Sequence, residues 1–244
     1  DDPTPHRHAG VSSQFALAAA AQAWRQAGLD NTPKIPKARP APRRMGLYLG
    51  AGEGHLDFDN FAATSLSAWN DAKRAVDTVA WAGAAHRLMD ARREIEQEPN
   101  ATLAQLARAF PLRGPAFNCM TACAASTQAV GEAFEIIRRG DADLMVAGGA
   151  HSMIHQLGMT GFIRLTAMSA RRESPQSAAR PFDQTRDGFV MGEGAGIVIL
   201  ESLDSALRRG ATPLAEIAGF GSTADAFRIT DIQPEGKGAA GAMS

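Results

Sequence analysis

The chain is short of cysteine, of net charge and of long apolar runs, and each shortage excludes a class of protein. Two cysteines among 244 residues are too few for a secreted domain held by disulfides, and they indicate a reducing compartment, the cytoplasm. A formal charge of −1 gives no overall attraction to nucleic acid. No apolar run reaches the roughly 18 residues that a membrane-spanning helix needs, so no membrane span is expected.

The chain does have enough apolar sequence for a large core, since hydrophobic residues make up 45% of it. Runs typical of strands alternate with runs typical of helices, which predicts one layered α/β domain. Strands are predicted at residues 45–50, 116–120, 144–147, 195–200 and 214–220. Helices are predicted at 11–27, within 58–69, 82–95 and 102–110, between Cys123 and Gly140, and at 203–207.

The most informative segment is a run of seven small residues, Thr121–Thr127. A short strand after Gly114-Pro115 leads into it, and a helix that can end at Gly140 follows. Cys123 is thereby placed at or next to a helix N-terminus, where unpaired N–H groups and the helix dipole favour the reactive thiolate. The same N–H groups can hold the oxyanion of a tetrahedral intermediate. Cys123 is therefore a candidate nucleophile, although an inert buried cysteine gives the same local pattern.

Two long motifs, Thr121–Thr127 and Arg180–Gly196, occur in this order and together resemble the β-ketoacyl synthases, the elongating condensing enzymes of fatty-acid and polyketide synthesis. Shorter stretches that support the resemblance are 14–20, 138–143, 146–150, 161–162 and 167–169. The similarity covers most of the chain and is weakest from about residue 57 to residue 109. It implies a thiolase-like fold with a layered αβα arrangement, of which this chain has mostly the N-terminal half.

Two features of the family pattern are absent from the sequence. Synthases of this kind pair the cysteine with two histidines on glycine-rich motifs of a C-terminal half, and none of the six histidines lies in such a motif. The apolar first strand of the family is absent too. We therefore expect residues 1–244 to be an N-terminal ketosynthase domain that is incomplete at both ends. Alone, such a chain is expected to accept an acyl group on Cys123 but not to condense.

The resemblance also implies a two-stage covalent mechanism in the complete protein. Cys123 takes an acyl group from a carrier-bound or CoA thioester, and the carbanion released by decarboxylation of a malonyl thioester then attacks that acyl group. Phe162 and Phe189 occupy positions that similar synthases use to line the acyl pocket, although core phenylalanines would give the same pattern. The implied partners are an acyl carrier protein and a second synthase subunit, in a homodimer or a paired complex. No metal and no organic cofactor is implied.

Basic residues gather in two places outside these motifs. Residues 30–44 form a predicted basic loop in which four prolines alternate with lysines and arginines. Such a basic segment either binds an acidic carrier protein or is ordinary solvated surface, and solvated surface is the more common case. Arg164, Arg171 and Arg172 lie closer to the motifs and are the better candidates for carrier contact.

Other interpretations of the sequence are weaker. Gly50–Gly54 after a strand suggests a nucleotide-binding oxidoreductase, but its spacing is GxGxG where the fingerprint needs GxGxxG. The cysteine pair with His151 and His155 has the residue types of a zinc site, but the gap between the pairs is far longer than in a zinc finger. A non-catalytic ketosynthase-like module for dimerisation or carrier docking is the main alternative function. A thiolase-type acyltransferase is less favoured because residues 180–196 have the ketosynthase pattern.

Overall fold

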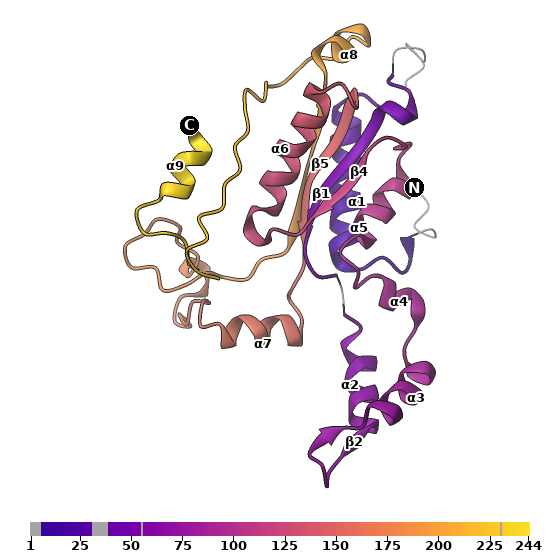
Figure 1. The fold of residues 1–244 in the computed structure, drawn as a ribbon, viewed down its shortest axis with the longest axis vertical. Coiled ribbons are helices and arrows are strands. Elements are labelled where there is room, and N and C mark those ends of the chain that lie inside the picture. The colour runs from indigo at the N-terminus through magenta and orange to yellow at the C-terminus, as the bar shows by residue number, and fades with distance from the viewer. Residues whose placement is uncertain (1–5, 31–38, 55, 230) are drawn as a thin grey trace.

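A four-stranded mixed sheet lies at the centre of the computed structural model, which describes residues 6–30, 39–54, 56–229 and 231–244 (Figure 1). The strands, in the spatial order β4-β1-β5-β6, are β4 (Ala116–Cys119), β1 (Met45–Ala51), β5 (Leu144–His151) and β6 (Gly194–Glu201). β4 and β5 run parallel to β1, whereas β6 runs antiparallel to β5. The carboxyl ends of three strands and the amino end of β6 therefore meet at one edge of the sheet, here called the carboxyl edge.

The two central strands are covered on both faces, as their sequences indicate. Nearly every residue of β1 and β5 is buried, and both are continuous apolar runs rather than alternating ones. Because successive side chains point to opposite faces, Leu47 and Leu49 pack on one side of the sheet while Tyr48 packs on the other. The sheet thus separates two hydrophobic clusters.

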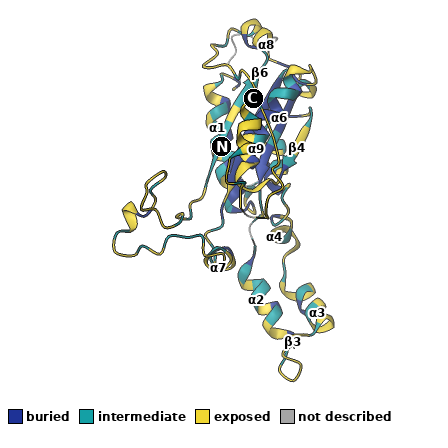
Figure 2. Ribbon diagram, turned by 60° about the vertical axis from the view of Figure 1, so that its left-hand side comes forward, coloured by how far each residue is buried: buried dark blue, intermediate teal, exposed yellow. Residues whose placement is uncertain are grey.

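Helices cover these two faces (Figures 1 and 2). α6 (Ala125–Arg138) lies on the Tyr48 face and buries small residues such as Ala129 and Ala133. α1 (Val11–Gln26) and α5 (Ala101–Ala109) lie together on the other face. In Figure 2 the buried residues concentrate in the sheet and in the helices against it.

A distant carboxylate holds the start of α1. Gly10 is the N-cap residue and offers no side chain for capping. Glu96 is 7% exposed and accepts hydrogen bonds from the Gly10 backbone N–H (2.9 Å) and the Ser13 hydroxyl (3.0 Å). The Gln105 side-chain amide of α5 also donates to Glu96, at 2.6 Å. Negative charge at a helix N-terminus is stabilising, so Glu96 ties α1 to α5 as well as capping it.

The remaining elements lie outside the packed centre. A projecting arm consists of α2 (Phe58–Ser67), the hairpin β2 (Trp69–Asn70) and β3 (Ala75–Val76), and α3 (Thr78–Leu88), and α4 (Ala91–Ile95) leads back from it. Figure 1 shows this arm extending beyond the carboxyl edge, with α7 (Gln156–Arg164) below the same edge. The short segments are η2 (Pro42–Arg44), η3 (Ala122–Ala124), η4 (Pro175–Ser177), α8 (Leu203–Arg208) and α9 (Lys237–Met243).

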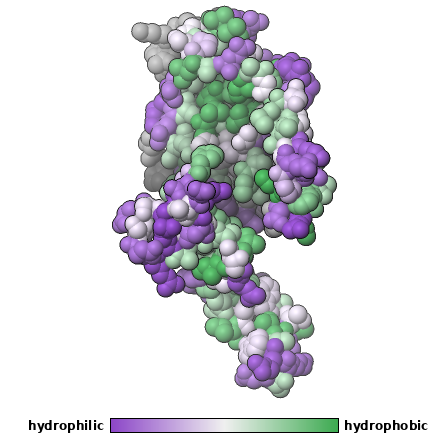
Figure 3. All heavy atoms as spheres, turned by 90° about the vertical axis from the view of Figure 1, so that its left-hand side faces the viewer, coloured by the Kyte–Doolittle hydropathy of each residue, from purple (hydrophilic) through white to green (hydrophobic). Residues whose placement is uncertain are grey.

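Large apolar side chains are exposed toward the C-terminal end of the chain. Val198 of β6, Leu207 of α8 and Leu214 are 44%, 59% and 81% exposed. The left-hand side of the molecule in Figure 1 faces the viewer in Figure 3, and its upper half also carries an apolar area. None of the helices in the described ranges combines the length and the apolar character needed to cross a bilayer.

The layered α/β arrangement is confirmed and four of the predicted strands form, but the strand predicted at 214–220 is wrong. The ring of Phe220 occupies the space that a side chain at Gly131 of α6 would fill. This segment therefore passes over a helix instead of lying beside a strand. Since a strand needs a neighbour to pair its backbone groups, apolar composition alone does not form one here.

The helical sequence predicted within 82–95 is divided between two helices, because two aspartates cap separate starts. Asp77 accepts hydrogen bonds from the N–H groups of Val79 and Ala80, so α3 begins earlier than predicted. Asp90 does the same for Arg92 and Arg93 at the start of α4. An aspartate with free N–H groups two and three residues ahead is a strong helix start.

Of the basic loop predicted at residues 30–44, positions 31–38 lie outside the described residues. Residues 42–44 form η2 directly before β1. Arg44 pairs with Asp143, with 2.7 Å between Nη2 and Oδ1, and so joins this segment to the start of β5. Arg44 thus has an internal partner.

Candidate active site

The turn between β4 and α6 places Cys123 at the surface. β4 ends at Cys119, η3 spans Ala122–Ala124, and α6 begins at Ala125. Ala122 has a φ of 49°, in the left-handed region. That conformation costs a residue other than glycine on the order of 1 kcal/mol and clusters at functional sites. The Cys123 side chain is exposed and, as the sequence predicts, lies next to a helix N-terminus.

The other cysteine has the opposite environment. Cys119 is buried, packs with Ala125 and Ala129, and donates from Sγ to the Ala125 carbonyl oxygen at 3.2 Å. Burial raises the pKa of the Cys119 thiol. Both cysteines are free, and Cys123 is the accessible one.

Two glycines under α6 fix the position of this turn. A Cβ at Gly50 of β1 would overlap the carbonyl group of Ala125. A Cβ at Gly149 of β5 would lie 2.8 Å from Cβ of Ser126. The first turn of α6 therefore rests directly on the backbone of the two central strands, at the carboxyl edge. This close approach requires glycine at both positions.

The same contacts explain the glycines that suggested nucleotide binding. Gly50 lies under α6, and a Cβ at Gly54 would overlap the Glu96 carbonyl. Both glycines permit backbone to pack against backbone. The packing accounts for Gly50 and Gly54 of the GxGxG pattern without a bound nucleotide.

Strand register brings the other predicted site residues to the same edge. Gly50 pairs with Cys119 on one side and with Gly149 on the other, and His151 pairs with Gly194. The turn with Cys123 follows β4, α7 with Phe162 follows β5, and Phe189 precedes β6. In a parallel α/β sheet, ligands bind at this edge. All three residues thus belong to loops and helices of the carboxyl edge.

Phe162 and Phe189 contact one another. Their ring centroids are 5.5 Å apart with the planes at 90°, an edge-to-face pair. Phe189 is held in place by backbone hydrogen bonds to Ala167 (3.0 Å) and Ser169 (2.9 Å). It is nevertheless 40% exposed, so the pair is an accessible apolar element rather than part of the core.

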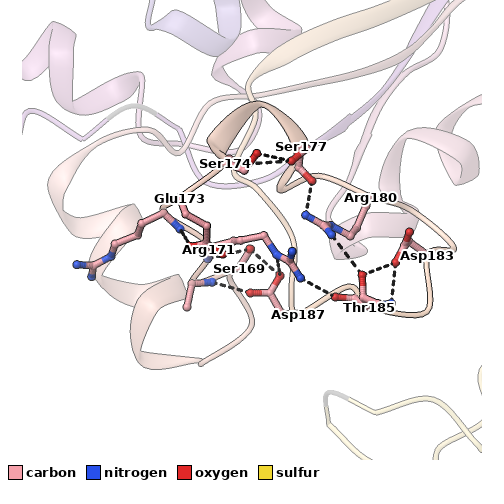
Figure 4. Close-up of polar contacts among 11 residues, drawn as sticks. Ser169, Arg171, Glu173, Ser174, Ser177, Arg180, Asp183, Thr185 and Asp187 are labelled. Carbon is pink, nitrogen blue, oxygen red and sulfur yellow. Dashed lines mark hydrogen bonds and ion pairs between the residues drawn. The ribbon is translucent and has the colours of Figure 1, made fainter.

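Polar contacts order the loop between α7 and β6 (Figure 4). Asp187 accepts hydrogen bonds from the Ser169 hydroxyl (2.7 Å) and the Ala170 N–H (3.1 Å), and the first of these holds the pKa of Asp187 below its usual value. The Thr185 hydroxyl likewise lowers the pKa of Asp183. This ordered loop carries two of the arginines predicted to contact a carrier.

The three candidate arginines differ in their surroundings. Arg171 donates to the Thr185 carbonyl oxygen at 3.2 Å and lies 4.0 Å from Asp187, so it braces the loop. Arg164 at the end of α7 and Arg172 have exposed side chains. Arg171 is thus partly engaged in contacts within the chain, whereas the side chains of Arg164 and Arg172 face solvent.

The structure shows two pairs of polar side chains at the carboxyl edge, and the sequence analysis predicted neither pairing. The Ser152 hydroxyl donates to Glu193 at 2.6 Å, which ties the end of β5 to the segment before β6. His151 Nε2 lies 3.8 Å from Oε2 of Glu53, which follows β1. The signal in the sequence was a polar residue at the end of a buried strand or within two residues of it.

Within the described ranges, no candidate metal cluster and neither of two surface cavities coincides with the turn that carries Cys123. The described ranges hold no group of three or more histidine, cysteine or acidic side chains placed to bind a metal. One surface cavity lies near the start of α1, between Arg7 and Arg93, and another is formed around Phe227 and Arg228. Neither cavity is lined by Cys123, Phe162 or Phe189.

Comparison with known families gives a match over most of the chain. Residues 3–206 match the family described as "Beta-ketoacyl synthase, N-terminal domain". The chain is 37% identical over 231 residues to 3-oxoacyl-[acyl-carrier-protein] synthase 2 of Staphylococcus aureus, which covers 95% of this chain and 52% of the relative. It is 46% identical over 141 residues to the synthase of the same name from Rhizobium meliloti (strain 1021), covering 57% of this chain and 34% of the relative.

Solved structures show the same architecture. A β-ketoacyl synthase from Burkholderia phymatum STM815 has a TM-score of 0.76 at 30% identity, over 94% of this chain and 51% of that one. A type II polyketide ketosynthase in complex with its acyl-carrier protein has a TM-score of 0.77 at 32% identity, over 95% and 53%. The predicted thiolase-like fold is confirmed. The chain spans about half the length of the curated relatives it matches.

Proposed function

The chain belongs to the β-ketoacyl synthase family, and from that premise we propose that it provides the nucleophile half of a chain-elongating synthase in which Cys123 carries the growing acyl group. The observation that carries the proposal is the position of this thiol. Cys123 is exposed in a turn with left-handed backbone, directly before α6 and at the edge of the sheet where ligands bind.

The first stage is acyl transfer from a carrier-bound or CoA thioester. Sγ of Cys123 attacks the thioester carbonyl carbon, the carbonyl oxygen becomes an oxyanion, and the carbon–sulfur bond to the leaving thiol breaks as that thiolate takes up a proton. The N–H groups at the start of α6 favour both the attacking thiolate and the oxyanion. The product is an acyl-cysteine thioester.

The second stage needs groups outside the motifs of this chain. In the complete protein, loss of carbon dioxide from a malonyl thioester gives a carbanion that attacks the acyl-cysteine and forms a 3-ketoacyl thioester. The family resemblance assigns the decarboxylation step to two histidines that lie in no motif here. We therefore expect this chain alone to be acylated but not to form the carbon–carbon bond.

Phe162 and Phe189 are proposed to contact the acyl chain. Their edge-to-face pair is partly exposed at the same edge of the sheet as Cys123, and Phe189 is fixed by two backbone hydrogen bonds. An apolar surface of fixed shape suits an alkyl chain.

An acyl carrier protein is the proposed donor partner. Among the structural relatives, a type II polyketide ketosynthase is seen in complex with its acyl-carrier protein. Arg164 and Arg172 are the exposed cations proposed to meet an acidic carrier, and Arg171 is proposed to support them through Thr185 and Asp187.

A second synthase subunit, identical or paired, is proposed to pack against β4. This strand is at the edge of the sheet, and Phe117 and Met120 beside it are 50% and 57% exposed. An unpaired edge strand with apolar side chains is a surface that another chain can cover. Two free thiols support a cytoplasmic location for the assembly.

The decisive experiment is intact-mass analysis after incubation with an acyl-CoA or acyl-carrier thioester. One acyl adduct is expected on the native chain and on Cys119→Ala, and none on Cys123→Ala. An adduct that survives in Cys123→Ala would assign the chemistry elsewhere. Absence of any adduct on the native chain would favour the non-catalytic docking module or an acyltransferase that needs its second half to react.

A further inference from the structure

Two leucines of α8 point away from the protein. Ser205 and Ala206, in the middle of this helix, are buried, so their side of the helix packs inward. Leu203 and Leu207 are 61% and 59% exposed. Because residues four apart in a helix lie on one face, these two side chains form a single apolar projection into solvent.

Buried polar contacts hold α8 in this orientation. Glu201, the last residue of β6, accepts hydrogen bonds from the Ser205 hydroxyl at 2.7 Å and from Nη2 of Arg209 at 2.6 Å. Nη1 of Arg209 also donates to the Ala27 carbonyl oxygen at the end of α1, at 2.6 Å. The side chains of Arg209 and Glu201 are largely buried. The leucine pair is therefore a fixed part of the surface.

Arginines surround α8 at the edge of the sheet opposite to the carboxyl edge, here called the amino edge. α1, α5 and α6 end at this edge, β1, β4 and β5 begin there, and α8 follows the end of β6. Figure 1 shows α8 and the end of α6 at one end of the molecule, with α7 and the projecting arm toward the other. In the described part of the chain, the charged side chains of the amino edge are nine arginines and six carboxylates: Arg25, Arg43, Arg44, Arg108, Arg113, Arg138, Arg139, Arg208, Arg209, Asp30, Glu135, Asp141, Asp143, Glu201 and Asp204.

Positive charge predominates at the amino edge because several arginines have no carboxylate partner. Arg25, Arg43, Arg108 and Arg208 are exposed, and within the described residues none of them forms an ion pair. The helix dipole favours a cation in a last turn, which accounts for three of these arginines but not for Arg43, in the short η2 before β1. The amino edge therefore presents positive charge around an apolar projection.

We propose that the amino edge binds the surface of an anionic lipid bilayer, with Leu203 and Leu207 inserted at the boundary between headgroups and acyl chains. Arginines are attracted to a negative membrane surface, and apolar side chains of a helix that are buried at that depth add to the binding. An acidic polymer in solution would satisfy the arginines alone, whereas a bilayer satisfies the arginines and the leucines. The attachment is peripheral, since α8 is far shorter than a membrane span.

The position of this surface is compatible with the proposed function and does not depend on it. The amino and carboxyl edges are opposite ends of the same strands, and the seven residues of β1 separate them by about 20 Å. The turn with Cys123 follows β4 at the carboxyl edge. A chain bound through its amino edge thus keeps this turn on the side away from the bilayer.

The test is co-sedimentation with vesicles of phosphatidylcholine, either alone or with about a third of phosphatidylglycerol. The native chain should bind the anionic vesicles at least about tenfold more tightly than the neutral ones, and added salt should weaken this binding. Arg43→Gln combined with Arg208→Gln should lower the partition coefficient about twentyfold, because each arginine near the surface contributes about fivefold. Leu203→Gln combined with Leu207→Gln should lower it about tenfold at unchanged charge.

The matched controls lie on the projecting arm, far from the amino edge. Arg74→Gln combined with Arg87→Gln removes the same charge from exposed positions, and Leu66→Gln combined with Val79→Gln removes two exposed apolar side chains. Both controls should bind the anionic vesicles like the native chain. They separate the effect of the amino edge from that of net charge or overall surface hydropathy.

Three results would overturn the proposal: no preference of the native chain for anionic vesicles, equal losses in the arm controls and the edge variants, or a loss in the arginine variant with none in the leucine variant. The third pattern would indicate an acidic polymer as the partner instead of a bilayer. If a double variant does not fold by circular dichroism, the single variant Leu207→Gln replaces it, with an expected loss of about threefold. Vesicle binding needs no acyl donor, so its failure and a failure of Cys123 to be acylated are separate results.

Discussion

Cys119, at the end of β4, and Cys123, in the turn that follows, are four residues apart, yet they lie in two different regions of the molecule. Cys119 is packed under α6 with its sulfur bonded to a carbonyl oxygen, while Cys123 is open to solvent. The first region is ordered by apolar packing and closely spaced backbone, and the second by turns and polar contacts. The exposed turn with the accessible thiol is therefore positioned by the buried layer directly beneath it.

The largest expected difference between the two regions is in thiol reactivity. In the native chain Cys123 should react with iodoacetamide about a thousandfold faster than Cys119, because Cys119 becomes accessible only when the structure opens locally. In urea the two rates should become similar. Quantifying both peptides by mass spectrometry provides the measurement, and comparable native rates would remove the contrast.

The dependence of the turn on its buried support can be tested at Gly50. Gly50→Ala forces a methyl group into the backbone of Ala125 and should lower the free energy of unfolding by about 3 kcal/mol. The matched control is Gly196→Ala in β6, where nothing lies within 4 Å of the added methyl group. Urea denaturation measures both. Equal stabilities of the two variants would show that the close contact between α6 and β1 does not contribute to the free energy of unfolding.

The buried region also depends on one charged side chain, Glu96. Glu96→Gln keeps the shape but turns an acceptor oxygen into an N–H donor facing other donors, and should cost about 2 kcal/mol. Glu98→Gln, which changes an exposed side chain two residues on, should be close to neutral. Denaturation midpoints compare the two. A Glu96→Gln variant as stable as the native chain would mean that the hydrogen bonds of Glu96 at the start of α1 contribute little to stability.

The smallest expected effect is the pH dependence of the pair between Arg44 and Asp143. Hydrogen bonds from Arg44 lower the pKa of Asp143 in the folded state, so the pair stabilises the protein above the unfolded pKa near 4 and this contribution is lost as the pH falls through the folded value. Because Arg44 is 39% exposed, solvent screens the pair, and the contribution is at most about 1 kcal/mol. Asp143→Asn should therefore be less stable than the native chain at pH 7 and equal to it near pH 2. A constant difference across this range would indicate lost packing rather than charge.

The sequence was most reliable where local signals agree. β1 and β5 are continuous apolar runs, and the structure places both inside the sheet. The small-residue run around Cys123 was correctly assigned to a strand-to-helix turn. It was least reliable where a partner decides the outcome, since residues 214–220 have strand-like composition but lie over α6.

For the candidate site, too, some features could be predicted from the sequence and others could not. Residue types could be predicted from the chain alone: a thiol before a helix, two phenylalanines and three arginines near two motifs. Contacts and exposure came from the folded chain, in which Cys123 is the exposed cysteine, Phe162 touches Phe189, and Asp187 lies beside Arg171. The physical reason is that short-range preferences fix turns and helix ends, whereas burial and side-chain contact depend on segments that strand pairing brings together from distant parts of the chain.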